Sequence, residues 1–226
     1  MGTPAQVAQM APLDIGNAIH ELVNQVTIGT AHLSFAKSVA AATNSHPVIL
    51  SVSPHFFVMT TNAHLECAQL YAAKLFDKPR DCASIPWLLE QARNRPQAFA
   101  NATITELGVA IQGAEAISSA QDPLLTSLKH RRDRWLAHLD RKTVKDQATF
   151  AENAKLTFKE LEGIFAAATE ILKSMAILHG AGESVIDGSH YNDFAPTLQL
   201  IEKGVQANAT ELEQRIGPCP DVEGSF

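Results

Sequence analysis

One short basic segment, residues 129–142, gathers the side chains of this chain that could act on a phosphodiester. It contains six of the chain's 18 lysines and arginines within 14 positions. Two acidic residues, Asp133 and Asp140, leave the segment with a net charge of +4, while the whole chain carries −6. The rest of the chain therefore sums to −10, so we expect any contact with nucleic acid to be confined to this segment.

Within the segment, Arg132 and His138 form a pair suited to cleaving RNA. Arginine neutralises phosphate charge, and histidine can transfer a proton near neutral pH. The two residues lie about 120° apart around an ideal helix, whereas Arg134 precedes His138 by one turn and shares its face. Arg132 would therefore require either an irregular helix or a second copy of the chain, and the spacing leaves Arg134 open as a second arginine.

The same segment concentrates like charges on one side of a helix. Four chargeable residues share a face there: Arg131, Arg134, His138 and Arg141. Their mutual repulsion would be relieved if a polyanion completed the site. The alternative is that Asp133 and Asp140 partly neutralise the patch, which would make it an ordinary solvated helix surface.

Other chemistries lack the residue patterns that they need. The three cysteines are far apart, and we find no metal-ligand cluster, glycine-rich phosphate loop, Gly-x-Ser-x-Gly or Cys-x-x-Cys motif. We therefore expect no metal and no cofactor. The cysteine usage favours a reducing cytoplasm, residues 1–12 lack the pattern of a signal peptide, and no apolar run is long enough to span a membrane.

The apolar spacing predicts helices almost throughout the chain. Hydrophobic residues make up 46% of it, enough for a substantial core. We expect a single all-α domain over residues 13–216, an antiparallel helical bundle, with loose ends at 1–12 and 217–226. The expected helices cover residues 14–43, 54–76, 85–93, 103–120, 122 into the basic segment, 157–179 and 192–207, and the one candidate strand covers 47–52.

The basic segment resembles the motif of the HEPN superfamily (higher eukaryotes and prokaryotes nucleotide-binding). In that motif an arginine and a polar residue precede a histidine by a few positions, as in Arg132-Asp133-Arg134-Trp135-Leu136-Ala137-His138. The run from Leu128 to Asp140 resembles the abortive-infection branch in particular, as do Leu75-Phe76-Asp77 and Ser84-Ile85 upstream. The resemblance covers about residues 56–207.

This resemblance implies an all-α bundle that pairs with a second copy so that two motifs face each other. Many members are metal-independent endoribonucleases of toxin–antitoxin or phage-defence systems, and others are inactive binding modules. By resemblance, Arg132 and His138 are the catalytic pair and Asp133 supports them. The shared helix face, rather than the resemblance, makes Arg131, Arg134 and Arg141 the expected further RNA-binding groups. One branch carries a modifiable tyrosine two residues after the histidine, where this chain has Asp140.

We therefore weigh three functions. The first is RNA cleavage of the toxin–antitoxin or abortive-infection type, with RNA, a second copy and an antitoxin protein as partners. The second is a catalytically inactive HEPN-like module that binds nucleotide, RNA or protein. The third is a structural helical dimer whose basic patch is only surface.

Overall fold

The computed structural model describes residues 14–78, 82–133, 156–181 and 193–216 of the chain. These residues form helices and no strand, which confirms the all-α class. The elements are α1 (Ile15–Ser45), α2 (Pro47–Ser51), α3 (Pro54–Leu75), α4 (Ile85–Asn94), the 3-10 turn η1 (Pro96–Ala98), α5 (Ile104–Ala120), α6 (Asp122–Arg131), α9 (Phe158–His179) and α10 (Phe194–Ile216).

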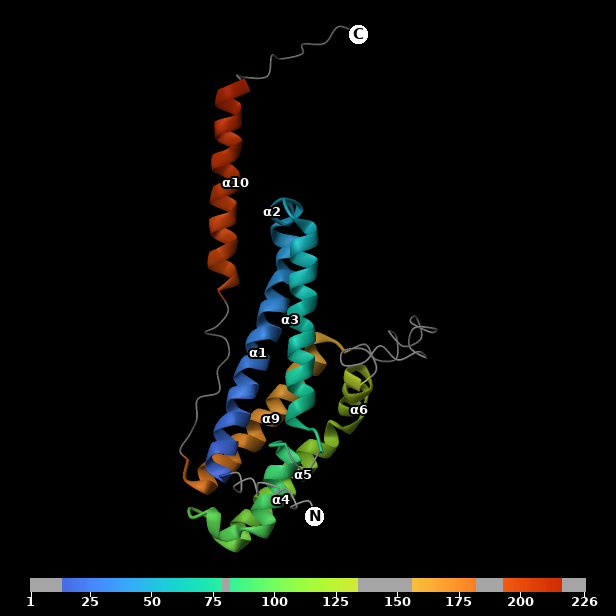
Figure 1. The fold of residues 1–226 in the computed structure, drawn as a ribbon, viewed down its shortest axis with the longest axis vertical. Coiled ribbons are helices and arrows are strands. Elements are labelled where there is room, and N and C mark those ends of the chain that lie inside the picture. The colour runs from blue at the N-terminus through green and yellow to red at the C-terminus, as the bar shows by residue number, and fades with distance from the viewer. Residues whose placement is uncertain (1–13, 79–81, 134–155, 182–192, 217–226) are drawn as a thin grey trace, which may run out of the picture.

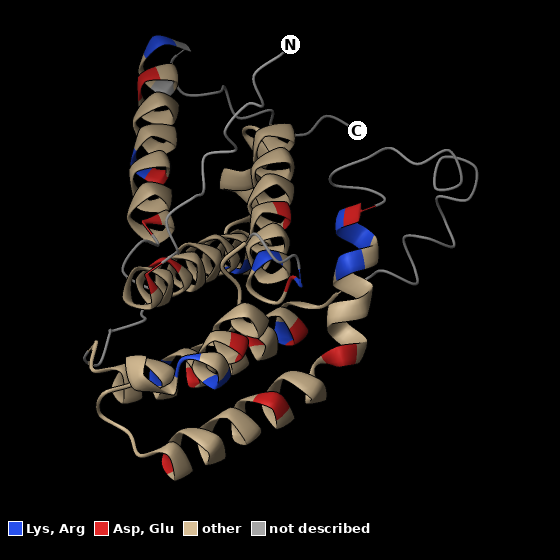
Figure 2. Cartoon of the chain, turned by 60° about the horizontal axis from the view of Figure 1, so that its bottom comes forward, with Lys and Arg blue, Asp and Glu red and all other residues tan. Residues whose placement is uncertain are grey.

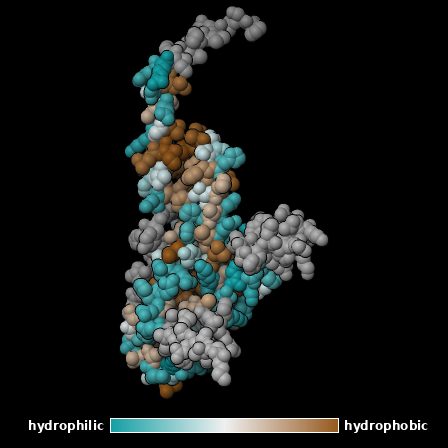
Figure 3. Space-filling view, in the orientation of Figure 1, coloured by the Kyte–Doolittle hydropathy of each residue, from teal (hydrophilic) through white to brown (hydrophobic). Residues whose placement is uncertain are grey.

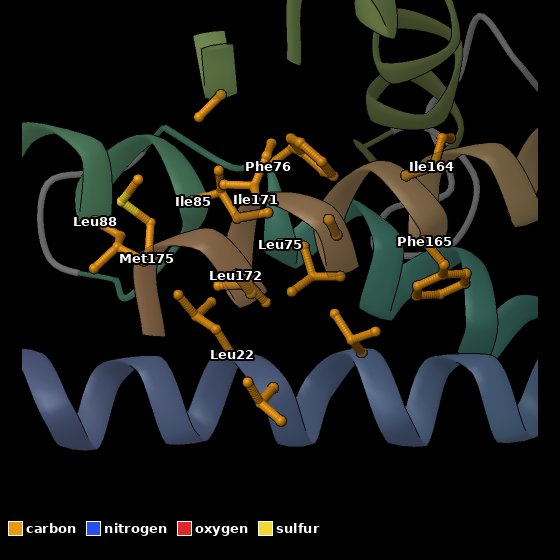
Figure 4. Packing of buried hydrophobic residues seen from close by; sticks show 14 of the residues in the cluster. Leu22, Leu75, Phe76, Ile85, Leu88, Ile164, Phe165, Ile171, Leu172 and Met175 are labelled. Atoms are coloured by element: carbon orange, nitrogen blue, oxygen red, sulfur yellow. The ribbon is translucent and has the colours of Figure 1, made fainter. Parts of the chain in front are cut away.

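Three long helices build the centre of the molecule. Helices α1 and α3 run side by side as an antiparallel pair, and α9 packs against both (Figure 1). Their facing sides contribute fully buried leucines, among them Leu22, Leu75 and Leu172 (Figure 4). Burying one such side chain stabilises the fold by about 2 kcal/mol, so this apolar contact decides how the three helices associate.

A glycine allows α1 to approach α9 closely. A Cβ atom on Gly29 would lie 2.5 Å from the ring of Phe165 and 3.0 Å from the Cβ of Tyr71. The Phe165 ring is itself buried in the core and has little room to move. Gly29 therefore sets the spacing at this crossing, although glycine has a low intrinsic preference for helix interiors.

Helix ends follow local sequence rules. Ser84 caps α4 by accepting a hydrogen bond from the Trp87 amide, and Thr157 forms the expected capping box with Glu160 at the start of α9. Thr103 and Glu106 form a second capping box at α5. At the other end of α9, Gly180 adopts a left-handed conformation with φ of 88°, which ends that helix as expected.

Two sequence predictions need correction. Residues 47–52 were the one candidate strand, but Pro47–Ser51 forms the short helix α2. Proline at the first helical position favours this turn, and Ile49 and Leu50 become buried against neighbouring helices. The last helix was expected to end near residue 207, but α10 continues to Ile216, since no proline or glycine interrupts residues 205–216.

The remaining helices form two groups at the periphery of the three central helices. Helices α4 and α5 pack together at one end and lead into α6, while α10 contacts α1 and α2 and then extends past them (Figure 1). Leu128 is fully buried and anchors α6 to the body. Among the described residues, no helix is both long enough and apolar enough to cross a membrane.

Candidate functional site

The start of the basic segment lies at the end of α6, beside the end of α3. Basic residues occupy the last turn of α6, where Figure 2 colours the ribbon blue for Lys and Arg. The backbone at Arg132 and Asp133 widens into a π-type turn directly after the regular helix. Such turns change the direction of side chains relative to an ideal helix and often occur at functional sites. The helix is therefore irregular at Arg132, which is one of the two possibilities that the spacing of Arg132 and His138 left open, the other being a second copy of the chain.

Two carboxylates hold the side chain of Arg132. Its Nη1 atom donates to Oδ2 of Asp77, which lies just after α3. Its Nε and Nη2 atoms both lie 2.7 Å from Oδ1 of Asp133. The two hydrogen bonds use two of the five N–H donors that a guanidinium carries, and Nη2 adds an ionic contact with Asp133, so other donors remain beyond the contacts of the described residues. Arg132 is thus oriented by acids on two sides and can still offer donors to an anion.

The surroundings of Arg132 keep it charged. Burial by itself would lower its pKa, but hydrogen bonds and charge from Asp133 and Asp77 outweigh burial and raise the pKa above the ordinary arginine value. The Arg132 and Asp77 side chains are only 20% and 25% exposed. The pair is therefore less screened by solvent than a surface ion pair, and the guanidinium is a fixed positive charge at any pH of interest.

A cleft of about 760 Å³ opens beside Arg132, between the end of α3 and helices α4, α5 and α6. Its wall includes four acids and four bases: Asp77, Glu90, Glu115, Asp122, Lys78, Arg93, Lys129 and Arg132. Arg93 pairs with Glu115 across the cleft wall, as Arg132 does with Asp77. Because its charges balance, the cleft is not a general polyanion groove, and attraction for phosphate concentrates at the end where α6 leads into the basic segment.

The two adjacent arginines point to different surroundings. Arg131 does not line the cleft; it is half-buried, and the charge of Glu66 on α3 acts on it. Burial lowers the pKa of Arg131, and the charge of Glu66 opposes this shift. Of the two, Arg132 is therefore the one placed to meet a ligand in the cleft, while Arg131 lies within the influence of the Glu66 charge on α3.

The structure brings together only part of the predicted site. Arg132 and Asp133 are in contact, and Arg131 is their neighbour in the chain. His138, Arg134 and Arg141 lie outside the described residues. Sequence reasoning missed the role of Asp77: it was noted only as part of an upstream pattern, and nothing local predicts a bond between residues 55 positions apart.

A second pair of polar residues was also missed. The Nδ1 atoms of His32 on α1 and His64 on α3 are 2.9 Å apart, so one ring donates to the other. The rings stack on Tyr71 and Phe35 respectively. Burial lowers the pKa of both histidines, and His32 lowers that of His64 further. Within the described part of the chain, no group of three or more histidines, cysteines or acids could hold a metal ion.

A comparison with protein families identifies the class of this chain. The model of the AbiU2 family of HEPN proteins matches residues 14–200. The chain therefore belongs to the HEPN superfamily, in its abortive-infection branch. The match begins at the start of α1, so it includes a helix that the resemblance over residues 56–207 had left out. No curated protein and no solved structure gives a significant match.

Proposed function

We propose that this chain is a metal-independent endoribonuclease of the abortive-infection type. The observation that carries the proposal is the placement of Arg132, oriented by Asp77 and Asp133 at the edge of a cleft, within the motif of its family. A permanently charged, oriented guanidinium is the group needed to stabilise charge that develops on a phosphate. His138, six residues further along, supplies the titratable group of the motif.

In the proposed reaction, the ribose 2′-hydroxyl of the RNA attacks the adjacent phosphorus. His138 accepts the hydroxyl proton, and the P–O5′ bond breaks as the new P–O2′ bond forms. The leaving 5′-oxygen takes up a proton, from His138 or from water, so the products are a 2′,3′-cyclic phosphate and a 5′-hydroxyl. Arg132 uses its remaining N–H donors to stabilise the charged phosphate in the transition state.

A second copy of the chain completes the proposed site. One motif offers few groups for a phosphodiester, and two motifs related by a two-fold axis would bring their arginines and histidines into one groove. Arg134 and Arg141 then serve as further RNA-binding groups. RNA and the second copy are the partners that this proposal requires, and an antitoxin protein that covers the groove is compatible with it.

A specific observation favours the alternative of an inactive binding module. Both sides of the Arg132 guanidinium already contact carboxylates, so a phosphate meets two fixed negative charges beside the arginine. Such competition weakens phosphate binding unless further basic groups of the segment contribute. In this alternative the segment binds RNA, nucleotide or protein without cleaving it.

Cleavage of total tRNA and mRNA by the purified protein in the presence of EDTA decides between the two functions. We expect cleavage to survive chelation and to be abolished by His138→Ala and by Arg132→Ala. Arg215→Ala is the matched control, because Arg215 is an exposed arginine on α10, away from the segment, and should retain full activity. Binding without cleavage would support the inactive module, and activity that needs added metal would refute the mechanism.

A further inference from the structure

The tip of the molecule, where α1 ends and α3 begins, has an unusual composition. No aspartate, glutamate, lysine or arginine occurs in the 28 residues from Ser38 to Leu65. Ten large apolar side chains are mostly exposed in the described part of the chain, and five of them lie within residues 48–59. These five are 58–71% exposed: Val48, Val52, Phe56, Val58 and Met59. Such clustering indicates a contact surface, because isolated exposed apolar residues are ordinary but contiguous ones are not.

A groove runs across this tip. It has a volume of about 450 Å³ and lies between the ends of α1, α2 and α3. Its walls are mainly apolar and include Val39, Leu50, Pro54, Phe57 and Val58. Figure 3 shows the apolar surface around the tip, next to the lower half of α10. An apolar groove between helices can accept the apolar face of another helix.

Helix α10 carries such an apolar face, and only the first half of that face packs against the rest of the chain. Phe194, Leu198 and Ile201 pack against α1 and α2 in a small core of their own. The same stripe continues at Val205, Ala209 and Leu212, within about 40° of one line along an ideal helix. This second half of α10 extends past the tip of α1 and α3 (Figure 1), and Leu212 is 57% exposed.

We propose that the tip is an interface between two copies of this chain, in which the projecting half of α10 from each copy lies in the tip groove of the other. The helix face continues a contact that already exists within one chain, so the partner helix meets a surface of the same chemistry. One chain carries both the helix and the groove, which is the requirement for a two-fold, self-complementary interface.

The absence of basic residues from the tip disfavours a membrane as the occupant. A helix that binds a membrane surface usually combines its apolar face with lysines and arginines that attract anionic lipids. The tip offers none of these residues over its 28 uncharged positions. On α10, Lys203 is offset by Glu202, and Arg215 pairs with Glu211. A neutral apolar surface of this kind is instead typical of the centre of a protein–protein interface.

The tip interface is independent of the proposed ribonuclease activity. The motif follows α6, which leaves the body near the opposite end of α3 from the tip (Figure 1). If motif pairing also occurs, the two interfaces together give a tetramer or a larger assembly, and loss of one leaves the other. Association of two copies can therefore be measured without RNA.

Light scattering of the full chain tests this interface, because it measures the mass of the particle in solution. Leu212→Glu places a charge in the exposed half of the stripe, and we expect it to halve the mass of the particle in solution. Leu200→Glu is the matched control, because Leu200 lies on the other side of α10 and is 69% exposed, so the mass should stay that of the wild type. Equal masses for the wild type and Leu212→Glu, with helical content unchanged, would overturn the proposal.

Mixed disulfide formation locates the contact. The native cysteines are first replaced by serine: Cys67, Cys82 and Cys219. One tagged copy then receives Val58→Cys in the groove. A second copy with a different tag receives Leu212→Cys. We expect a disulfide that joins the two tags after oxidation of the mixture, and none when Leu200→Cys replaces Leu212→Cys. Equal cross-linking from positions 200 and 212, or none from either, would place any association elsewhere.

Discussion

Replacement of Asp77 by asparagine is the sharpest test of how the arginine is positioned. Asparagine keeps the size of the side chain and one acceptor oxygen, but it removes the negative charge beside Arg132. Asp77 touches Arg132 from the segment that follows α3, so the change separates this long-range contact from the local contact to Asp133. We expect Arg132 to lose orientation at its Nη1 side and to keep its bonds to Asp133.

The magnitude follows from how far the pair is buried. A fully exposed ion pair contributes about 0.2–1 kcal/mol, and a hydrogen bond to a charged group contributes about 1.5–3 kcal/mol. Because the Asp77 and Arg132 side chains are 25% and 20% exposed, the pair lies between these limits. We expect Asp77→Asn to lower the free energy of unfolding by about 1–2 kcal/mol, an equilibrium change of roughly 5- to 30-fold.

A double-mutant cycle isolates this interaction from other effects of each change. Urea unfolding is measured for the wild type, Asp77→Asn, Arg132→Gln and the double variant, and we expect a coupling energy of about 1–2 kcal/mol. RNA cleavage is measured on the same proteins, and Asp77→Asn should lower kcat more than it raises KM, because it affects orientation more than attraction. A coupling energy near zero would refute the assigned contact. Tighter RNA binding by Asp77→Asn would instead mean that Asp77 shields the arginine.

Three further predictions concern packing, pH and the choice of arginine. Gly29→Ala should lower the free energy of unfolding by about 1–3 kcal/mol in a denaturant titration, because its Cβ would overlap the Phe165 ring. Gly163→Ala is the control: a Cβ at that position would meet no atom within 4 Å, so the change should be neutral or stabilising. The stability of the wild type should fall as pH drops below 6.5, because burial lowers the pKa of both paired histidines in the folded state and the unfolded chain then binds more protons. Thermal unfolding of His64→Asn between pH 5 and 7.5 should show a shallower dependence of stability on pH. An unchanged dependence would contradict this origin. Arg132→Lys should reduce cleavage much more than Arg134→Lys, because lysine cannot reproduce the planar fork held between two carboxylates; equal, mild losses that grow steeply with salt would favour the binding module.

The sequence determined those features that depend on neighbours along the chain. Thr157 and Glu160 form a capping box because they are three positions apart, and Gly180 ends α9 because glycine tolerates a positive φ. The apolar stripes of α1, α3 and α9 indicated an all-α protein. The Arg132–His138 motif, together with the Leu75-Phe76-Asp77 pattern upstream of it, indicated the family. These inferences succeed because helix geometry converts sequence spacing into spatial proximity.

Tertiary structure decided what depends on residues far apart in the chain. Asp77 meets Arg132 across 55 positions, and His32 meets His64 across 32, so no local pattern could pair them. Residues 47–51 carry the β-branched, apolar composition of a strand, yet they form a short helix. An isolated strand leaves its backbone groups without ladder partners, whereas this helix closes some hydrogen bonds locally, such as that from the Leu50 N–H to the His46 carbonyl. Packing of Ile49 and Leu50 against neighbouring helices then stabilises the helical conformation, which the local sequence alone left undecided.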